Sequence, residues 1–523
     1  MRERLSAGGG RANSPLTGGS LLARNSYINL AGQLAPVLVA IITIPLLIKV
    51  LGSERFGVLA LAWVVMGYFG LFDFGLGRAT TKFVAEYRAR GEEEGLPELV
   101  WTSILVHALL GLLGGIILAV LTPWLTGSLL NVPADLVSET RISFYLLAVS
   151  VPLLVATAAL RGVLEALQRF DLANLIKIPS SMLNYLGPLL VLYFVRGLVP
   201  VIAFLVVSRL VVLLAHLYFC LRTMPGLSQG FQFNLARMKP LAGMGGWLTV
   251  SSFMGPSVAA IDRFMIGAFV SLSAVAIYAT PYEAVTKLMI FPASLLGVLF
   301  PAFSAMAVDR GDELRRLYFR AFKYLLVLVA PLVGVLLALA YELMSWWVTP
   351  AFAVESAPVV QWLAIGVLIN VLAQVPVTAL QGMGRADVTA KLQLLQLPLY
   401  GIAIWILVGP LGITGVAMAW ALRALVTAAL LLTAAHRLLP LPKESEDHFF
   451  WTGSAVIGGF LIMFLGLGSA LADNVIWKVG SVIVLLFVLV LWEWAFFLKS
   501  GDRSVFIAGG KPFLRMLKLS KRP

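Results

Sequence analysis

The feature that most constrains this chain is a series of long apolar stretches. A helix needs about 20 predominantly apolar residues to cross a bilayer, and about 14 such stretches follow one another between residues 27 and 498. Hydrophobic residues make up 60% of the chain and charged residues only 12%, whereas about a quarter of a soluble domain is charged. The sequence therefore predicts an all-α polytopic membrane protein with about 14 transmembrane helices.

Lysine and arginine are unevenly distributed between the two sides of the predicted bundle. Taken alternately, one set of loops together with both termini holds about 27 basic residues, whereas the other set holds about two. Because cytoplasmic loops retain positive charge, both termini are predicted to be cytoplasmic. The net charge of +13 is explained by these loops, so no nucleic-acid partner is predicted.

The chain contains an internal repeat. ALRGVLEALQRFDLANLIK, from Ala159, resembles ALQGMGRADVTAK, from Ala379. Further along, SRLVVLLAHL resembles LRALVTAALL, which aligns Arg209 with Arg423. With six helices in each copy, an even number, both copies have the same orientation, and a pseudo-two-fold axis along the membrane normal relates them.

This repeat divides the predicted chain into two six-helix lobes and two additional C-terminal helices. The first 26 residues do not show the pattern of a signal peptide, and neither terminal segment contains a long apolar run. The expected segments are a disordered cytoplasmic tail (1–26), an N-terminal lobe (27–221), a cytoplasmic linker (222–241), a C-terminal lobe (242–436), helices 13 and 14 (437–498) and a basic cytoplasmic tail (499–523).

Basic residues within the predicted spans are candidates for anion binding. Arg209 and Arg423 fall about halfway along their spans, and neither has a carboxylate one helical turn away. Charge at this depth is costly, so ionisable residues there are functional candidates. The guanidinium of arginine binds phosphate oxygens at two points and stays charged. We therefore predict that Arg209, Arg423, Arg263 and Lys287 bind a phosphate or another anionic group.

Three carboxylates are candidates for coupling to protons or sodium ions. Asp262 precedes Arg263 toward the outer end of helix seven, and Glu283 shares a helix face with Lys287. Asp73 lies in the sequence DFGLG near the cytoplasmic end of helix two. Structural roles remain open for these residues, because Glu283 and Lys287 can neutralise each other and Asp73 can bind a neighbouring backbone group.

Motifs of the common enzyme and metal sites are missing from the sequence. The chain has one cysteine, and its four histidines lack metal-ligand spacing. It has neither a phosphate-binding loop for ATP nor a long outer loop for a polymerase or ligase site. The sequence predicts a protein that is not an enzyme and uses neither a metal nor a cofactor.

Several segments, in order, resemble polysaccharide flippases. LIKVLGSERFGVLALAWVVMGYFGLFDFGLG (46–76) is similar to their first helical hairpin, and AAIDRFMIGAFVSLSAVAIYATPYEAV (259–285) to their seventh and eighth helices. Residues 296–306, 370–401 and 412–425 extend the resemblance over about 27–436. The branch that fits best is the O-antigen (Wzx-type) flippases of the multidrug/oligosaccharidyl-lipid/polysaccharide superfamily.

This resemblance implies a substrate and a mode of transport. The substrate would be an undecaprenyl-pyrophosphate-linked oligosaccharide, moved by alternating access from the cytoplasmic to the periplasmic leaflet of a bacterial inner membrane for surface polysaccharide biosynthesis. Implied partners are membrane lipid, H⁺ or Na⁺, a polysaccharide polymerase and a chain-length regulator. The alternatives are a multidrug/cation antiporter of the same superfamily, which predicts an acidic cleft, and a glycan polymerase or ligase, which predicts a large periplasmic loop.

Overall fold

The computed structural model describes residues 38–71, 95–167, 169–230, 261–293, 311–438, 446–470 and 474–498, with isolated positions between these ranges. Asp73, residues 231–233 and 235–241 of the linker, the predicted N-terminal tail and all of the predicted C-terminal tail except position 503 lie outside the described residues. The described part of the chain consists of helices and connecting turns, without a strand. The prediction of an all-α polytopic membrane protein is confirmed.

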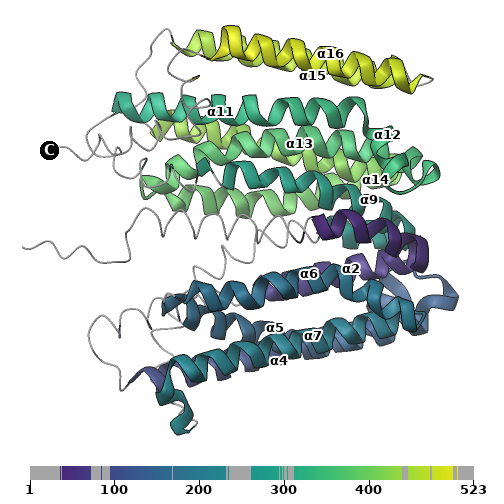
Figure 1. The fold of residues 1–523 in the computed structure, drawn as a ribbon, viewed down its shortest axis with the longest axis vertical. Coiled ribbons are helices and arrows are strands. Elements are labelled where there is room, and N and C mark those ends of the chain that lie inside the picture. The colour runs from purple at the N-terminus through teal and green to yellow at the C-terminus, as the bar shows by residue number, and fades with distance from the viewer. Residues whose placement is uncertain are drawn as a thin grey trace, which may run out of the picture.

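The helices form two groups, which we call the N-lobe and the C-lobe (Figure 1). In the N-lobe, helical residues 38–51 precede α2 (Ser53–Leu71), α4 (Leu96–Trp124), α5 (Val137–Ala166), α6 (Phe170–Phe194) and α7 (Leu198–Thr223). In the C-lobe, helical residues 261–269 precede α9 (Leu272–Val285), α11 (Gly311–Ala338), α12 (Ala340–Trp347), α13 (Pro350–Gly382) and α14 (Ala386–Leu438).

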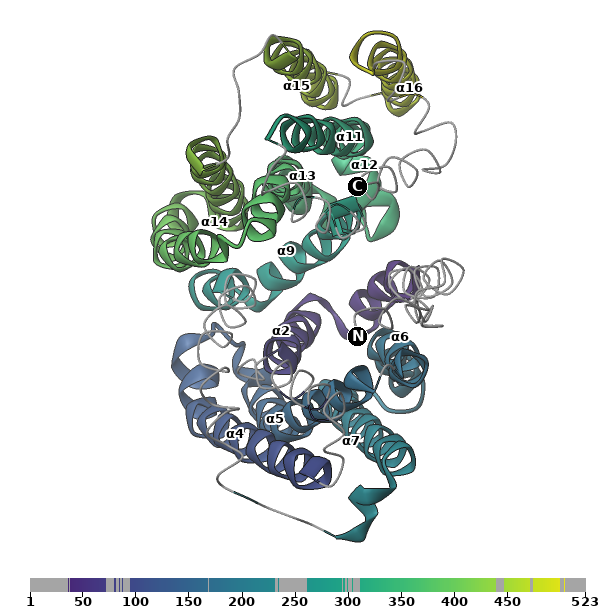
Figure 2. The same cartoon turned by 90° about the vertical axis from the view of Figure 1, so that its left-hand side faces the viewer.

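The last two helices, α15 (Glu446–Ala470) and α16 (Val475–Trp492), lie at the outer edge of the C-lobe, beside α11 (Figures 1 and 2). Lys478 of α16 donates a 2.7 Å hydrogen bond to Glu342 of α12, and only 3% of the lysine side chain is exposed. This buried ion pair connects the added helices to the C-lobe.

Nine helices of the described part are long and apolar enough to cross a membrane by length and composition, and Leu38–Leu51 is a shorter apolar helix. Several helices extend beyond the apolar stretches. For example, α11 begins at Gly311, whereas the long apolar stretch of this part of the sequence begins only near residue 322. The additional turns contain Arg315, Arg316 and Arg320. Polar residues form these turns because a helix satisfies its backbone hydrogen bonds equally well beyond the hydrocarbon region.

The longest helix, α14, is two spans joined end to end. Gly412 lies at the break, with φ of 57° and ψ of −137°, a conformation open to glycine but strained for other residues. The two arms fold back so closely that a Cβ atom on Gly415 would lie 2.2 Å from the carbonyl oxygen of Leu407. These arms correspond to the predicted helices eleven (392–409) and twelve (412–436).

Both lobes contain the same ion pair at corresponding places. Arg169 pairs with Asp171 at the start of α6, with two hydrogen bonds of 3.0 Å. Arg385 pairs with Asp387 at the start of α14, at 3.2 Å. The first pair comes just after the end of α5 and the second just after the end of α13, and these are the helices in which the two copies of the repeat begin. The repeated sequence therefore has a repeated local structure.

The two lobes meet where α2 crosses the beginning of α9 (Figure 2). At this crossing, a Cβ atom on Gly57 would lie only 1.9 Å from the carbonyl oxygen of Leu272. Any other residue at position 57 would therefore have to push the two helix backbones apart. Glycine is required here for a close approach between helices, as is common in membrane bundles.

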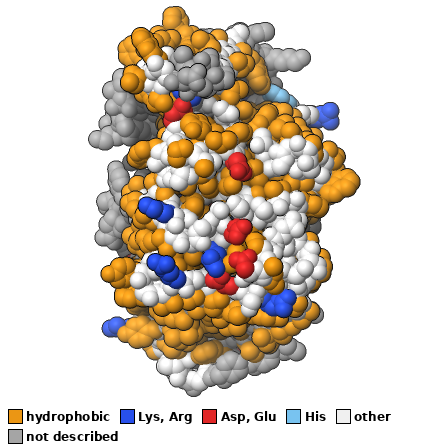
Figure 3. Space-filling model, turned by 90° about the vertical axis from the view of Figure 1, so that its right-hand side faces the viewer, with side chains coloured by type: hydrophobic (Ala, Val, Ile, Leu, Met, Phe, Trp, Pro, Cys, Tyr) orange, Lys and Arg blue, Asp and Glu red, His pale blue; other side chains and the backbone are white. Residues whose placement is uncertain are grey.

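A second contact holds the lobes together at the same end of the molecule. The backbone N–H of Asn131, in the loop between α4 and α5, donates to the carbonyl of Gly267 at 2.8 Å. Its side chain donates to the carbonyls of Ala268, at 2.8 Å, and Val270, at 3.4 Å. This end of the molecule, seen in Figure 3, shows largely apolar surface with charges of both signs among it.

The crossing at Gly57 leads to a prediction about stability. Gly57→Ala should destabilise the protein by about 1–3 kcal/mol, because the added methyl group overpacks a contact between two backbones. Gly67→Ala, on the same helix, is the matched control because nothing lies within 4 Å of its added Cβ. The midpoint of thermal unfolding of the purified protein in detergent measures both effects. Equal midpoints for the two variants would contradict the close approach of α2 and α9.

Candidate functional site

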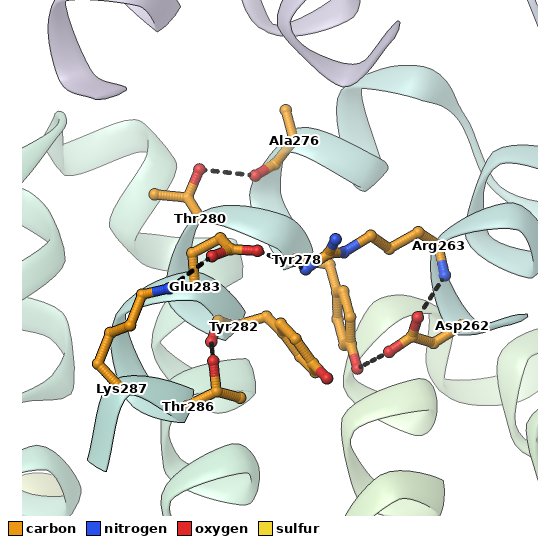
Figure 4. Close-up of polar contacts among 9 residues, drawn as sticks. All are labelled: Asp262, Arg263, Ala276, Tyr278, Thr280, Tyr282, Glu283, Thr286 and Lys287. Atoms are coloured by element: carbon orange, nitrogen blue, oxygen red, sulfur yellow. Dashed lines mark hydrogen bonds and ion pairs between the residues drawn. The ribbon is translucent and has the colours of Figure 1, made fainter. Parts of the chain in front are cut away.

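The helix α9 supplies most of the candidate site. Its first turn is capped by Ser271, whose hydroxyl oxygen accepts a 3.0 Å hydrogen bond from the backbone N–H of Ala274. The α-helix ends at Val285 and continues as a 3-10 helix, Thr286–Met289. This continuous run places Tyr278, Tyr282 and Glu283 along one length of helix, beside residues 261–269 (Figure 4).

Asp262 is the most deeply buried carboxylate of the site. It is 0% exposed, and one of its oxygens accepts a 2.8 Å hydrogen bond from the hydroxyl group of Tyr278. The other accepts from the backbone N–H of Arg263, also at 2.8 Å. These bonds supply partners that a buried carboxylate needs inside a protein.

Glu283 forms ion pairs with both Arg263 and Lys287 (Figure 4). One of its oxygens accepts from Arg263 at 3.0 Å and the other from Lys287 at 3.2 Å. Exposure rises along this triad, from 7% for the Arg263 side chain to 27% for Glu283 and 40% for Lys287. The triad therefore carries one excess positive charge and is most accessible at Lys287.

Aromatic rings link this triad to Arg423. The guanidinium of Arg263 lies 4.7 Å from the ring centroid of Tyr282, and that ring makes an edge-to-face contact with Trp420 at 6.1 Å. Arg423 lies over Trp420 at 5.3 Å and over Tyr400 at 5.4 Å. Cation–π contacts of this kind stabilise an arginine without neutralising its charge.

A pocket of about 240 Å³ opens beside this aromatic bridge. It lies between α13 and the two arms of α14, and both Tyr282 and Arg423 line it. The other described residues of the lining are rich in amides and hydroxyls and include no acidic side chain. The C-lobe thus combines a cationic triad with a neighbouring polar pocket.

The predicted site residues do not all come together. Asp262, Arg263, Glu283 and Lys287 form one connected cluster, and Asp262 lies within electrostatic range of Arg423. Arg209 is separate, in the N-lobe, where it donates a 2.8 Å hydrogen bond to the side-chain oxygen of Asn184 on α6.

Arg209 and Arg423 nevertheless share two features. Among the residues that the structure describes, no carboxylate forms an ion pair with either guanidinium. Both arginines also have a buried Nε without a hydrogen-bond partner. Each reaches the preceding membrane span of its own lobe, through Asn184 in one case and Tyr400 in the other.

The residues that sequence analysis missed are mostly aromatic rings and amides. Tyr278, Tyr282 and Trp420 look like ordinary packing residues in an apolar sequence, because only the contacts reveal that they connect charged groups. The amides did carry a signal. Gln393 and Gln396 are three residues apart within an apolar segment and so share one helix face, where burial requires hydrogen-bond partners.

Comparison with known proteins identifies the family. The family model described as "Polysaccharide biosynthesis protein" matches residues 22–307, more than half of the chain. The chain belongs to the polysaccharide biosynthesis protein family. The resemblance to polysaccharide flippases seen in the sequence is therefore confirmed.

One relative of this chain is a Shigella flexneri protein named "Putative O-antigen transporter". The two are 28% identical over 410 residues, which cover 78% of this chain and 96% of the relative. One similar solved structure is the lipid II flippase MurJ in an inward closed conformation, with a TM-score of 0.69 and 12% identity over 90% of this chain and 97% of that chain. Another is an inward-facing multidrug resistance MATE transporter of the MOP superfamily, with a TM-score of 0.65 and 17% identity over 79% of this chain and 94% of that chain. These likenesses show that the fold is shared.

The ion-pair triad of Arg263, Glu283 and Lys287 leads to a prediction about the stability of this family member. Glu283→Gln should destabilise the protein by about 3 kcal/mol or more, since the buried Arg263 loses its carboxylate. Lys287→Met should lower the free energy of unfolding by less than about 1 kcal/mol, because the Lys287 side chain is 40% exposed and Glu283 keeps its ion pair with Arg263. Thermal unfolding in detergent compares the two variants. Similar losses would show that Arg263 does not depend on Glu283.

Proposed function

We propose that this protein is a flippase for an undecaprenyl-pyrophosphate-linked oligosaccharide. It moves this lipid from the cytoplasmic to the periplasmic leaflet by alternating access, for the biosynthesis of O-antigen, capsule or exopolysaccharide. The family and the relative named as an O-antigen transporter support a substrate of this class. The named relatives are transporters or flippases, and we propose that this chain likewise catalyses no covalent step.

The observation that carries the proposal is the surplus of positive charge on membrane-spanning helices. Among the described residues, only two carboxylates contact any of the cations Arg209, Arg263, Lys287 and Arg423: Glu283 pairs with Arg263 and Lys287, and Asp262 accepts from the backbone N–H of Arg263. Uncompensated charge inside a membrane is costly, and it persists where a ligand or water-filled cavity supplies the balance. A pyrophosphate brings negative charge of the required sign.

Coupling to H⁺ or Na⁺ is proposed at Asp262 and Glu283. Both are bonded in this structure, Asp262 to Tyr278 and Glu283 to Arg263 and Lys287. An anion that binds Arg263 and Lys287 competes with Glu283 for them, and the released carboxylate can then take up a cation. Asp73 remains a candidate from sequence. Further proposed partners are a polysaccharide polymerase and a chain-length regulator.

The multidrug/cation antiporter is less well supported. A transporter of organic cations needs an acidic cleft to attract them. In the described C-lobe, the pocket is lined by an arginine without any acidic side chain, and Glu283 is shared between two cations. This charge balance favours an anionic substrate.

The protein is a multi-pass membrane protein, and we propose that it lies in a bacterial inner membrane with both termini in the cytoplasm. Single cysteines test this orientation in a Cys220→Ala background, since Cys220 is the only cysteine and is buried. Ser128→Cys and Ser228→Cys are matched because both positions are exposed. An impermeant thiol reagent added to intact cells should modify position 128 and not position 228. The opposite pattern would reverse the orientation.

Substitution of the arginines tests the substrate. Arg209→Ala and Arg423→Ala should each lower surface glycan by about tenfold or more, because charge-assisted hydrogen bonds to the pyrophosphate or to the anionic sugars are lost. Lysine at either position should restore part of the export, since the charge remains but the two-point contact is lost. Arg437→Ala, at the exposed end of the same helix as Arg423, is the control.

The same strains show which lipid accumulates. Cells lacking the flippase should collect lipid-linked oligosaccharide on the cytoplasmic face. The purified protein should bind this lipid more tightly at low than at high salt, because the attraction is partly Coulombic. Normal surface glycan in the deletion strain, together with sensitivity to cationic drugs, would support the antiporter and overturn this proposal.

A further inference from the structure

The polar pocket of the C-lobe is unusual for the interior of a membrane bundle. Four carboxamides line it: Asn370 and Gln374 from α13, and Gln393 and Gln396 from the first arm of α14. Thr389 and Thr427 add hydroxyl groups, and Tyr282 and Trp420 add aromatic rings. Amide side chains are costly in a membrane interior unless they have partners. Such a concentration calls for a polar ligand.

Unused hydrogen-bonding groups in the pocket support this view. Gln396 is only 5% exposed, yet its Nε2 amide nitrogen has no hydrogen-bond partner. Arg423, at the same pocket, has a buried Nε without a partner. Leaving a buried donor unpaired costs roughly as much as a lost hydrogen bond, so native proteins rarely do so. The pocket therefore presents donors that its own side chains do not satisfy.

The chemistry of the lining selects among polar ligands. Each carboxamide offers both donors and an acceptor, which matches hydroxyl groups that also donate and accept. Aromatic rings offer flat surfaces for an apolar ring face. A phosphate would leave the carboxamide oxygens without donors to accept from, and a large drug needs more space, because drug-sized ligands occupy pockets of about 300–1,000 Å³. A single sugar ring satisfies each of these conditions.

We propose that this pocket binds one sugar residue of the lipid-linked oligosaccharide. The proposal rests on the function proposed above and adds a saccharide subsite to it. The carboxamides of α13 and α14 hydrogen-bond the sugar hydroxyls, Trp420 packs against the ring, and Arg423 lies at the charged edge of the pocket. Arg423 is thereby assigned to the saccharide rather than to the pyrophosphate.

The position of the pocket fits a ligand with two chemically different parts. Tyr282 lines the pocket, and its ring centroid also lies 4.7 Å from the guanidinium of Arg263. A single molecule can therefore place a sugar in the pocket and its pyrophosphate near Arg263 and Lys287. The saccharide subsite and the cationic triad are adjacent parts of one binding region in the C-lobe.

Two lipids that differ only in the glycan test the subsite. The probes are undecaprenyl pyrophosphate and the lipid-linked oligosaccharide extracted from a host strain that lacks this protein. The wild-type protein, purified in detergent, should bind the glycan-bearing lipid more tightly. Gln396→Leu should weaken that binding about five- to tenfold, as expected for the loss of one or two hydrogen bonds, and leave the affinity for undecaprenyl pyrophosphate unchanged.

Two further variants complete the experiment. Gln381→Leu makes the same chemical change at an exposed position of α13 outside the pocket, and it should alter neither affinity. Gln393→Leu, at a partly exposed position of the lining, should reproduce the selective loss, and it replaces Gln396→Leu if that variant fails to fold. Retained binding of undecaprenyl pyrophosphate reports that each variant is folded.

The outcomes separate the subsite from the function. If the wild-type protein binds both lipids equally, or if the pocket variants weaken both equally, the saccharide subsite is wrong while the flippase function stands. If the wild-type protein binds neither lipid, the proposed function itself is wrong. A loss confined to the glycan-bearing lipid supports both.

Discussion

The contact between the bare backbone of Gly57 and the carbonyl of Leu272 governs how the two lobes meet. It brings α2 against the start of α9, at the end of the molecule where Asn131 also reaches across to Gly267. The helix that makes this contact carries Tyr278, Tyr282 and Glu283 further along its length. One helix, α9, therefore carries both the contact between the lobes and most of the charged site.

The two lobes use their repeated architecture differently. In the N-lobe, the guanidinium of Arg209 donates a hydrogen bond to the neutral side-chain amide of Asn184. In the C-lobe, Arg423 lies on two aromatic rings and beside the carboxamide pocket, near the triad of Arg263, Glu283 and Lys287. Each copy of the sequence repeat thus holds one such arginine, while the described contacts that could recognise a sugar-bearing ligand are concentrated in the C-lobe.

The charge balance of the C-lobe explains how it keeps ionisable groups within the membrane. Asp262 is held by a tyrosine hydroxyl and a backbone N–H, and Glu283 by two cations. Both of these carboxylates are satisfied, so the groups of the site that still lack partners include Nε of Arg423 and the amide nitrogen of Gln396. Such a site favours an anion with hydroxyl groups, which is the chemistry of a glycan attached to a pyrophosphate.

The sequence by itself determined the fold class, the repeat and most of the charged candidates. Apolar stretches long enough to span a bilayer leave the backbone no alternative to helices, and charges inside such stretches are few enough to identify one by one. Tertiary structure alone decided which candidates meet. It joined Asp262, Arg263, Glu283 and Lys287 in one cluster, kept Arg209 apart, and assembled the pocket from amides on α13 and α14. Helical spacing places residues on a face, but the partner of that face is set by packing between helices that are distant in the sequence.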